Sequence, residues 1–329
     1  MIYPMKFNPV FKETIWGGKK LGLLLNKDTP GSADVGESWE VADHPNGTST
    51  AANGGLNGRS FHEIFQAFRD DILGPRLAAR FTDRFPLLVK FIDARDRLSL
   101  QVHPDDAYAK IHENGSFGKT EAWYVTHAEP GAFLIAGLKK RSSREEFEKA
   151  LAEGVLEELM NKVPVKPGDF LFIPAGRIHA IMPGILLNEI QQNSDITYRV
   201  YDWGRTDKNG KSRELHVRQS LETINFNDSG VRALPSDQAE KLDDQRRLLT
   251  RNPFFSTEKW VFDRIDSSTQ EGARQGFHIL SVLSGQGTLC WKDGQVDVKT
   301  GDSLVVPWST GTYSVVSLDG TMTVLNSYI

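Results

Sequence analysis

Three side chains in the first two thirds of the chain could together bind a metal ion: His103, Glu121 and His179. Two imidazoles and one carboxylate suit zinc, and they suit equally the facial triad of a non-haem iron centre. Gln101 precedes His103 by two residues, so in a strand it shares the same face and can add an amide oxygen. These residue types therefore indicate metal chemistry at a single site.

His179 ends a stretch whose pattern is typical of a ligand held at the end of a β-strand. Residues 168–179 read GDFLFIPAGRIH: a glycine turn, an apolar strand, then a proline–glycine turn that presents one histidine. A strand followed by a rigid turn can hold a side chain in the fixed geometry that a metal needs. The spacing G-x5-P-x-G-x2-H resembles the second conserved motif of the cupin β-barrels.

Several segments alternate polar and apolar residues, which is the period of a β-strand. Each segment alone favours a strand with a solvated polar face. Their number, next to the histidine of the proline–glycine turn, favours instead a barrel with a polar interior. The polar positions of these segments are Ser99, Gln101 and His103, then Lys119 and Glu121, then Glu189 and Gln191, and finally Thr197, Arg199 and Tyr201.

The composition argues against several classes of partner. Charged residues make up 25% and hydrophobic residues 39% of the 329 residues, which predicts a substantial packed core. A net charge of −4 without a long basic block argues against nucleic acid or an anionic membrane as a partner. The single cysteine, Cys290, favours a reducing compartment. With no signal-peptide pattern and no membrane-spanning run, we expect a cytoplasmic protein.

Short β-type runs between glycine, proline and asparagine turns fill most of the chain, so we expect a mainly β fold. One pattern occurs twice: residues 168–174 (GDFLFIP) align with residues 301–307 (GDSLVVP), and the second copy has no histidine after it. We therefore predict two cupin-type, jelly-roll β-barrel domains. The catalytic barrel is expected over 1–235, and a linker with a second, metal-free barrel over 236–329.

A few helices are expected to pack on the first barrel, over about 58–82, 142–162 and 213–224. Ser60 and Glu63 form a capping box at the start of the first helix, and Ser143 and Glu146 form one at the start of the second. In the third helix, Leu215 is expected to face inward.

With these residues the chain resembles the type I mannose-6-phosphate isomerases in their shorter bacterial form. The Q-x-H-P-D and K-x-E elements, followed by the late histidine and S-D-x-x-x-R, are together very specific. Two features differ from the larger eukaryotic members, which carry a lysine in place of Arg205 and a large helical insertion that this chain mostly lacks. The matching segments are 16–18 (WGG), 36–39 (GESW), 86–90 (PLLVK), 98–106 (LSLQVHPDD), 118–121 (GKTE), 173–181 (IPAGRIHAI) and 188–195 (NEIQQNSD), with Arg199 and Arg205.

The resemblance implies a role for each of these polar residues. It implies one Zn²⁺ per chain, with the ligands Gln101, His103, Glu121 and His179. It implies that Arg199 is an active-site arginine and that Lys119 and Glu189 line the same pocket. It places three residues near the phosphate of the sugar: Lys90, Ser99 and Arg205.

The implied reaction interconverts D-mannose 6-phosphate and D-fructose 6-phosphate through an enediol or enediolate. A zinc ion would polarise the substrate's carbonyl, and Arg199 would stabilise the developing negative charge. Glu189 is a plausible proton carrier because the metal does not need it, and Lys119 is the alternative.

Two other functions use the same features. A cupin iron dioxygenase has a similar histidine and carboxylate set, but Gln101, Lys119 and the arginines favour an anionic sugar over an apolar aromatic substrate. A non-catalytic cupin that only binds a sugar phosphate would not need Glu189, Lys119 and Arg199 together.

Overall fold

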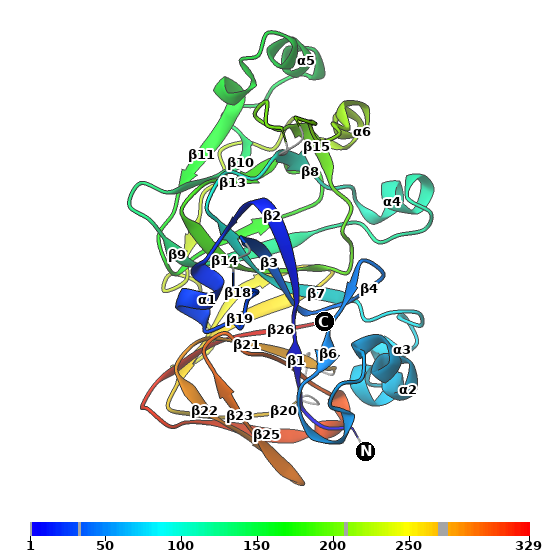
Figure 1. The fold of residues 1–329 in the computed structure, drawn as a ribbon, viewed down its shortest axis with the longest axis vertical. Coiled ribbons are helices and arrows are strands. Elements are labelled where there is room, and N and C mark those ends of the chain that lie inside the picture. The colour runs from blue at the N-terminus through cyan, green and yellow to red at the C-terminus, as the bar shows by residue number, and fades with distance from the viewer. Residues whose placement is uncertain (1, 32–33, 207–209, 269–275) are drawn as a thin grey trace.

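Figure 1 shows the computed structural model of the chain, which describes residues 2–31, 34–206, 210–268 and 276–329. In this described part, four large β-sheets lie one above another along the long axis. We number them sheets I to IV from the top of Figure 1 to the bottom. Sheets I and II form one jelly-roll-type sandwich and sheets III and IV form another, so the predicted mainly β, cupin-type fold is confirmed.

Sheets I and II enclose an apolar cluster that includes Trp123, Leu134 and Leu171. The strands of sheet I are, in spatial order, β11 (Met160–Pro164), β10 (Phe133–Leu138), β13 (His179–Ile181), β8 (Leu100–Val102) and β15 (Tyr198–Tyr201). Those of sheet II are β16 (Leu234–Pro235), β12 (Asp169–Ile173), β9 (Glu121–Ala128), β14 (Ile185–Gln192), β7 (Leu87–Ala94), β3 (Val35–Val41) and β2 (Val10–Gly18).

Sheets III and IV enclose a second cluster around Trp260, Leu280 and Tyr313. The strands of sheet III are β17 (Glu240–Lys241), β18 (Arg246–Arg251), β19 (Ser256–Phe262), β26 (Met322–Tyr328), β21 (His278–Ser284), β24 (Ser303–Val306), β1 (Met5–Asn8) and β6 (Thr50–Ala51). Those of sheet IV are β20 (Arg264–Ser268), β25 (Thr312–Ser317), β22 (Gln286–Trp291) and β23 (Gly294–Lys299). A small ribbon of β4 (Asp43–His44) and β5 (Gly47–Thr48) lies apart from these sheets.

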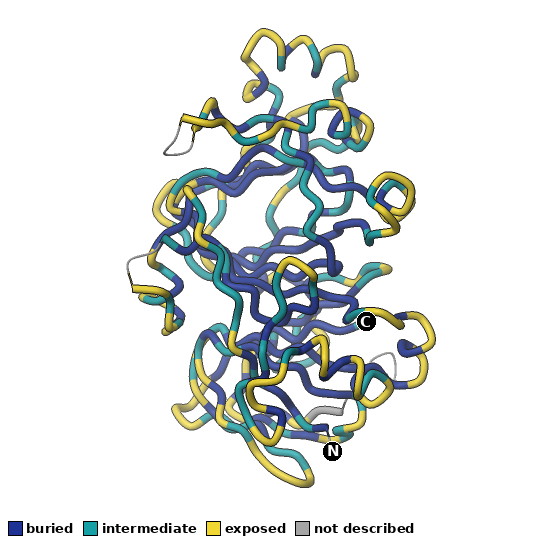
Figure 2. The backbone as a smooth tube through the Cα atoms, turned by 45° about the vertical axis from the view of Figure 1, so that its right-hand side comes forward, coloured by how far each residue is buried: buried dark blue, intermediate teal, exposed yellow. Residues whose placement is uncertain are grey.

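The two sandwiches pack back to back through sheets II and III. The apolar cluster between them joins Val89 and Tyr124 of sheet II to Ile279 and Leu325 of sheet III. Every residue of β7 and β14 is consequently buried, because both faces of these strands are covered. Figure 2 shows this buried layer across the middle of the molecule, with exposed backbone mainly at the surface loops.

The helices lie at the margins of the sheets. Both predicted capping boxes are present, at Ser60 with Glu63 and at Ser143 with Glu146. No helix in the described ranges is long and apolar enough to cross a membrane. The α-helices are α1 (Lys20–Leu25), α2 (Phe61–Leu73), α3 (Pro75–Ala78), α4 (Asp106–His112), α5 (Arg144–Ala152) and α6 (Val217–Thr223), and short 3₁₀ turns are η1 (Gly54–Leu56), η2 (Leu156–Leu159) and η4 (Trp308–Thr310).

The helices differ from the sequence prediction mainly in their bounds. The helix expected over about 58–82 is divided at Gly74 into α2 and α3, and the one expected over 213–224 begins at Val217. The helix expected over 142–162 ends at Ala152, because Gly154 adopts a positive φ of 73° and β11 begins soon after. Leu215, which we expected to face inward, precedes α6 and is 44% exposed. In addition, α2 packs into the cluster between sheets II and III and contacts η4, so it touches both sandwiches.

The repeated sequence pattern has the same backbone in both sandwiches. Gly168 and Gly301 have φ values of 93° and 92°, a region that favours glycine, and each is followed by a strand that ends directly before a proline. The N-terminal strand β1 pairs with β24 of the second copy. A strand near the start of the chain therefore joins the sheet that residues 240–328 build.

Candidate metal centre and adjoining cavity

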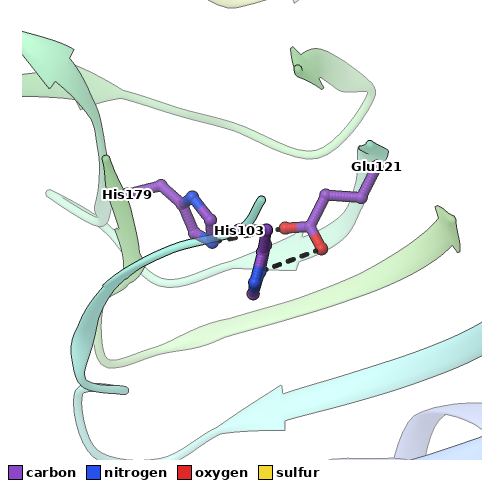
Figure 3. A group of neighbouring side chains, drawn as sticks. All are labelled: His103, Glu121 and His179. Atoms are coloured by element: carbon purple, nitrogen blue, oxygen red, sulfur yellow. Dashed lines mark ion pairs between the residues drawn. The ribbon is translucent and has the colours of Figure 1, made fainter. Parts of the chain in front are cut away.

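The three predicted donors meet between sheets I and II. His103 follows β8, Glu121 begins β9 and His179 begins β13, and strand pairing sets their positions: His179 lies opposite Gln101, and Glu121 opposite Ile173. Figure 3 shows the three side chains pointing toward one another. The predicted group is thus brought together by strands that are far apart in the sequence.

The donor atoms have the spacing of a metal site. His103 Nε2 lies 3.4 Å from Glu121 Oε2, and His179 Nε2 lies 3.4 Å from Glu121 Oε1. One ligand atom from each of the three residues falls within 4.8 Å of the others, and the side chains are at most 1% exposed. Three converging buried donors are the arrangement that a zinc or iron ion requires.

Hydrogen bonds fix which nitrogen of each histidine can bind a metal. His103 Nδ1 donates to the carbonyl oxygen of Ile196 at 2.7 Å, and His179 Nδ1 donates to that of Arg177 at 2.8 Å. Because a carbonyl oxygen only accepts, both Nδ1 atoms must carry the proton. Burial lowers the pKa of His179 to about 3 and that of His103 well below its usual value. Both rings are therefore neutral, with the Nε2 lone pair available for a metal.

Glu121 also has the properties of a metal ligand. Its side chain is fully buried, and its Oε1 atom accepts no hydrogen bond from the described residues. Burial, together with the negative charge of Glu189, raises the pKa of Glu121 to about 7 although Lys119 opposes the shift. A bound cation would both satisfy the oxygen and stabilise the ionised carboxylate.

Gln101 and Lys119 border the three donors. The amide nitrogen of Gln101 lies 3.3 Å from His179 Nε2, and the Gln101 oxygen accepts a hydrogen bond from Ser99 Oγ at 3.2 Å. A rotation of the Gln101 amide by half a turn would exchange its nitrogen and its oxygen, so that the oxygen would face the donors. Lys119 Nζ lies 2.9 Å from His103 Nε2 and also contacts Glu121 Oε2. Gln101 is thus adjacent to the three donors, as the predicted set of four metal ligands requires.

A cavity of about 210 Å³ adjoins this centre. Three tryptophan side chains and several charged side chains form its wall, as expected of a pocket for a polar ring. The predicted site residues Lys90, Ser99, Gln101, Lys119, Glu189 and Arg199 all line it, together with Thr14, Trp16, Glu37, Trp39, Ile92, Leu98, Trp123, Ile181, Asp195, Thr197 and Arg213.

Buried ion pairs set the charges of Lys90 and Glu189. Lys90 Nζ lies 3.2 Å from Glu37 Oε2 and 3.5 Å from Glu189 Oε1. Burial alone would lower the pKa of Lys90, but the two carboxylates raise it above its usual value. Burial would likewise raise the pKa of Glu189, but Lys119 and Lys90 lower it, with Trp123 Nε1 donating to Oε2 at 2.7 Å. Glu189 is therefore an ionised carboxylate at the cavity wall.

Arg205 lies outside the cavity lining. It bonds instead to Asp202, at 2.6 Å, and to the main-chain oxygen of Arg97. Three charged residues that line the cavity are not among the predicted site residues: Glu37, Asp195 and Arg213. Glu37 and Asp195 fall within segments that matched the resembled family, whereas Arg213 comes from a loop with no motif around it.

Comparisons with known proteins agree along the whole chain. Residues 5–136 match the model of the phosphomannose isomerase type I catalytic domain, and residues 245–329 match that of the mannose-6-phosphate isomerase cupin domain. The chain is 39% identical to the mannose-6-phosphate isomerase ManA of Bacillus subtilis, with 95% of each chain covered. It is 36% identical to the mannose-6-phosphate isomerase of Streptococcus mutans, with 100% of this chain and 99% of the relative covered.

A solved structure shows the same fold. The crystal structure of the Bacillus subtilis mannose 6-phosphate isomerase superposes with a TM-score of 0.88 at 34% identity, and all of both chains is covered. Together with identities above 30% over nearly the full length, this likeness settles the family. The chain belongs to the type I mannose-6-phosphate isomerases.

Proposed function

We propose that the protein interconverts D-mannose 6-phosphate and D-fructose 6-phosphate with one zinc ion bound per chain. The observation that carries the proposal is the convergence of His103, Glu121 and His179 beside a charged cavity of about 210 Å³. Family membership supports the choice of substrate, because the relatives named above are mannose-6-phosphate isomerases.

The metal would be held by His103, Glu121 and His179, with the Gln101 amide oxygen as a fourth ligand. Two nitrogens and two oxygens suit the tetrahedral preference of zinc. When bound, zinc supplies a Lewis acid that polarises the carbonyl group of the open-chain sugar. The Nδ1 hydrogen bonds of both histidines to main-chain oxygens would hold the rings in position.

The proton transfer between C2 and C1 needs a base at the cavity wall. Glu189 lines the cavity, is ionised and is oriented by Trp123, so it can accept the C2 proton and return it at C1. Lys119, which contacts the donor cluster, is the alternative carrier. Arg199 lines the same cavity and can stabilise the enediolate oxygens.

The substrate phosphate would anchor the sugar away from its reacting end. Ser99 and Lys90 line the cavity and are the phosphate contacts that we propose there, as the family resemblance implies. Binding energy from the phosphate can then orient C1 and C2, which is how a remote anchor raises the rate of a reaction. The resemblance also implies that Arg205 lies near the phosphate. In the structure, the Arg205 side chain donates a hydrogen bond to the Asp202 carboxylate.

We also propose a division of work along the chain, with catalysis in 1–235 and a metal-free, structural barrel in 236–329. The donor residues all lie in, or directly after, strands of sheets I and II, which supports this division. The pairing of β1 with β24 supports treating the two parts as one folding unit. The single cysteine supports a cytoplasmic location.

A coupled assay from mannose 6-phosphate to fructose 6-phosphate tests the proposal. We expect turnover in the zinc-loaded protein, loss of turnover after chelation, and recovery when zinc is returned. Iron with oxygen uptake would identify a dioxygenase instead, and a zinc-loaded protein without turnover would identify a sugar-phosphate binder. With a substrate deuterated at C2, full retention of deuterium at C1 would replace the proton route by a hydride shift.

A further inference from the structure

Two guanidinium groups share one carboxylate beside the cavity. Arg213 donates from Nε to Asp202 Oδ2 at 2.8 Å and from Nη2 to Oδ1 at 2.5 Å. Arg205 Nη2 donates to the same Oδ1 atom at 2.6 Å. Burial would raise the pKa of Asp202, but the hydrogen bonds from the two arginines lower it. Asp202 is therefore an anion that holds both side chains.

Arg199 adds a third positive charge next to this group. It forms no ion pair with a described residue: Nη1 donates to the carbonyl oxygen of Glu214 at 2.8 Å, and Nε is buried without a hydrogen-bond partner. Burial, followed by the charges of Arg213 and Arg205, lowers the pKa of Arg199. Three guanidinium groups around one buried carboxylate form a site in which an added anion would be stabilised.

The two arginines that are paired with Asp202 differ in their position relative to the cavity. Arg213 lines the cavity with Arg199, whereas Arg205 does not. The Nε, Nη1 and Nη2 atoms of Arg205 are all bonded, to main-chain oxygens of Asp202 and Arg97 and to the Asp202 carboxylate. Arg213 uses Nε and Nη2 on Asp202, and its Nη1 meets no acceptor among the described residues. Arg213 thus retains a free donor at the cavity.

The lysines of the cavity are compensated by carboxylates. Lys90 is paired with Glu37 and Glu189, and Lys119 with Glu121. An anionic group that enters the cavity would therefore be attracted most strongly to the arginine side. A guanidinium also matches the geometry of a phosphate oxygen pair better than an ammonium does.

We propose that Arg213 binds the phosphate group of the substrate, in addition to the contacts from Ser99 and Lys90 proposed above, while the neighbouring Arg199 remains available for the enediolate oxygens. Arg205 is then a positioning residue: it holds Asp202, which in turn holds Arg213. This inference rests on the proposed isomerase function for the identity of the substrate, but the binding of a phosphate anion at Arg213 can be measured separately.

The test compares the wild type with Arg213→Met in two measurements. In the coupled assay we expect the KM for mannose 6-phosphate to rise about 10- to 100-fold, the worth of a charge-assisted hydrogen bond, with a much smaller change in kcat. In a calorimetric titration with inorganic phosphate, we expect the dissociation constant to rise by a similar factor. Arg213→Lys keeps the charge, so it should recover part of the lost affinity.

Other variants separate direct binding from a general loss of structure. Arg218→Met removes an arginine whose side chain is 86% exposed and paired with Glu222 on α6, and it should change neither measurement. Arg205→Met should raise the KM less than Arg213→Met does, because it acts through Asp202. Melting temperatures check that each variant is folded.

Two results would overturn the inference. One is an Arg213→Met variant whose KM and phosphate affinity both stay within twofold of the wild type. The other is a larger loss of phosphate affinity in Arg205→Met than in Arg213→Met. A wild-type protein that binds phosphate through Arg213 but turns over no mannose 6-phosphate would contradict the proposed function alone.

Discussion

The two sandwiches place different side chains at matching positions of the same strand framework. In the first, Ile173, the residue before the proline of the repeated motif, pairs with Glu121; in the second, Val306 at the same motif position pairs with His278. His278 in sheet III therefore corresponds to the ligand candidate Glu121 in sheet II. A tyrosine, Tyr313, follows the second motif where His179 follows the first, after a turn that is one residue longer.

The correspondence extends across the neighbouring strands. Glu189 pairs with Trp123, two residues after Glu121, and with Lys90 on its other side. In the second sandwich, the residue in that place is Asn326, which pairs with Leu280, two residues after His278, and with Glu258 on its other side. By strand pairing, the second cluster thus matches the first site at the positions of Glu121, Glu189 and Lys90.

The side chains of the second sandwich form hydrogen bonds and ring contacts at the matching positions. Tyr313 OH and His278 Nδ1 are 2.6 Å apart, and Glu258 accepts hydrogen bonds from Trp260 Nε1 at 2.7 Å and Tyr328 OH at 2.8 Å. The rings of Trp260, Tyr313 and Tyr328 surround the imidazole of His278. The repeated backbone motif alone therefore does not predict a metal site. Whether a metal can bind depends on the side chains at the matching positions.

The largest difference in the effect of substitution on kcat is expected between His179 and Tyr313, the residues that follow the two motifs. His179→Ala should lower kcat at least about 1000-fold and abolish stoichiometric metal binding, because a ligand of the Lewis acid is lost. Tyr313→Phe, at the matching position, should leave kcat within twofold and only cost about 1 kcal/mol of stability through its lost hydrogen bond. Metal analysis and the coupled assay measure both; similar kinetics in the two variants would refute the contrast.

Substitutions at Glu189 and Asn326 are expected to show the next largest difference in kcat. Glu189→Gln keeps the size of the side chain and removes the proposed base, so kcat should fall about 100-fold, with little change in metal content. If Glu189→Gln kept most of its activity while Lys119→Met lost it, the proton would travel through Lys119. The same measurement on Asn326→Leu, with no expected change in kcat, is the matched control.

Glu258 tests whether the second sandwich is purely structural. Glu258→Ala leaves the buried donors of Trp260 and Tyr328 without their acceptor, and should lower the free energy of unfolding by about 2–4 kcal/mol. Urea denaturation measures this loss. The kcat of the folded variant should be unchanged, and a fall in kcat without a fall in stability would show that this residue couples to the catalytic site.

The smallest effect is expected at Asn326 itself. Its side chain is fully buried, and neither its nitrogen nor its oxygen has a hydrogen-bond partner among the described residues. An unpaired buried amide is destabilising, so Asn326→Leu, with the same number of side-chain heavy atoms and the same branching, should raise the free energy of unfolding by about 1 kcal/mol. A loss of stability in that variant would mean that bound water satisfies the amide.

Local signals in the sequence predicted much of the fold and of the metal centre. His103, Glu121 and His179 could be singled out because their residue types are rare inside β-proteins and because strand alternation placed them on common faces. Ser60 and Ser143 could be recognised as helix starts because a capping box uses only residues three positions apart. The glycines of the repeated motif likewise mark a local backbone conformation.

Features that depend on distant contacts could not be read from the chain. The burial of both faces of β7 arises because sheet III packs on sheet II, and no pattern within residues 87–94 reports that partner. Arg213 enters the cavity from a loop without periodicity, held by an ion pair to Asp202 that only the folded chain forms. The positive charge of Arg205 could be recognised in the sequence. Its ion pair with Asp202 could not, because that pair also forms only in the folded chain.

The pairing of Met5 with Val305 has a consequence for synthesis of the protein. At 5–20 residues per second, a ribosome needs roughly 15–60 s to travel between these two residues. During that time β1 has left the ribosome without its neighbour β24, and its hydrogen-bonding edge is open to other chains. The last strand of the sheet, β26, ends at Tyr328, so the nascent chain cannot close this sheet before residue 328 has been synthesised.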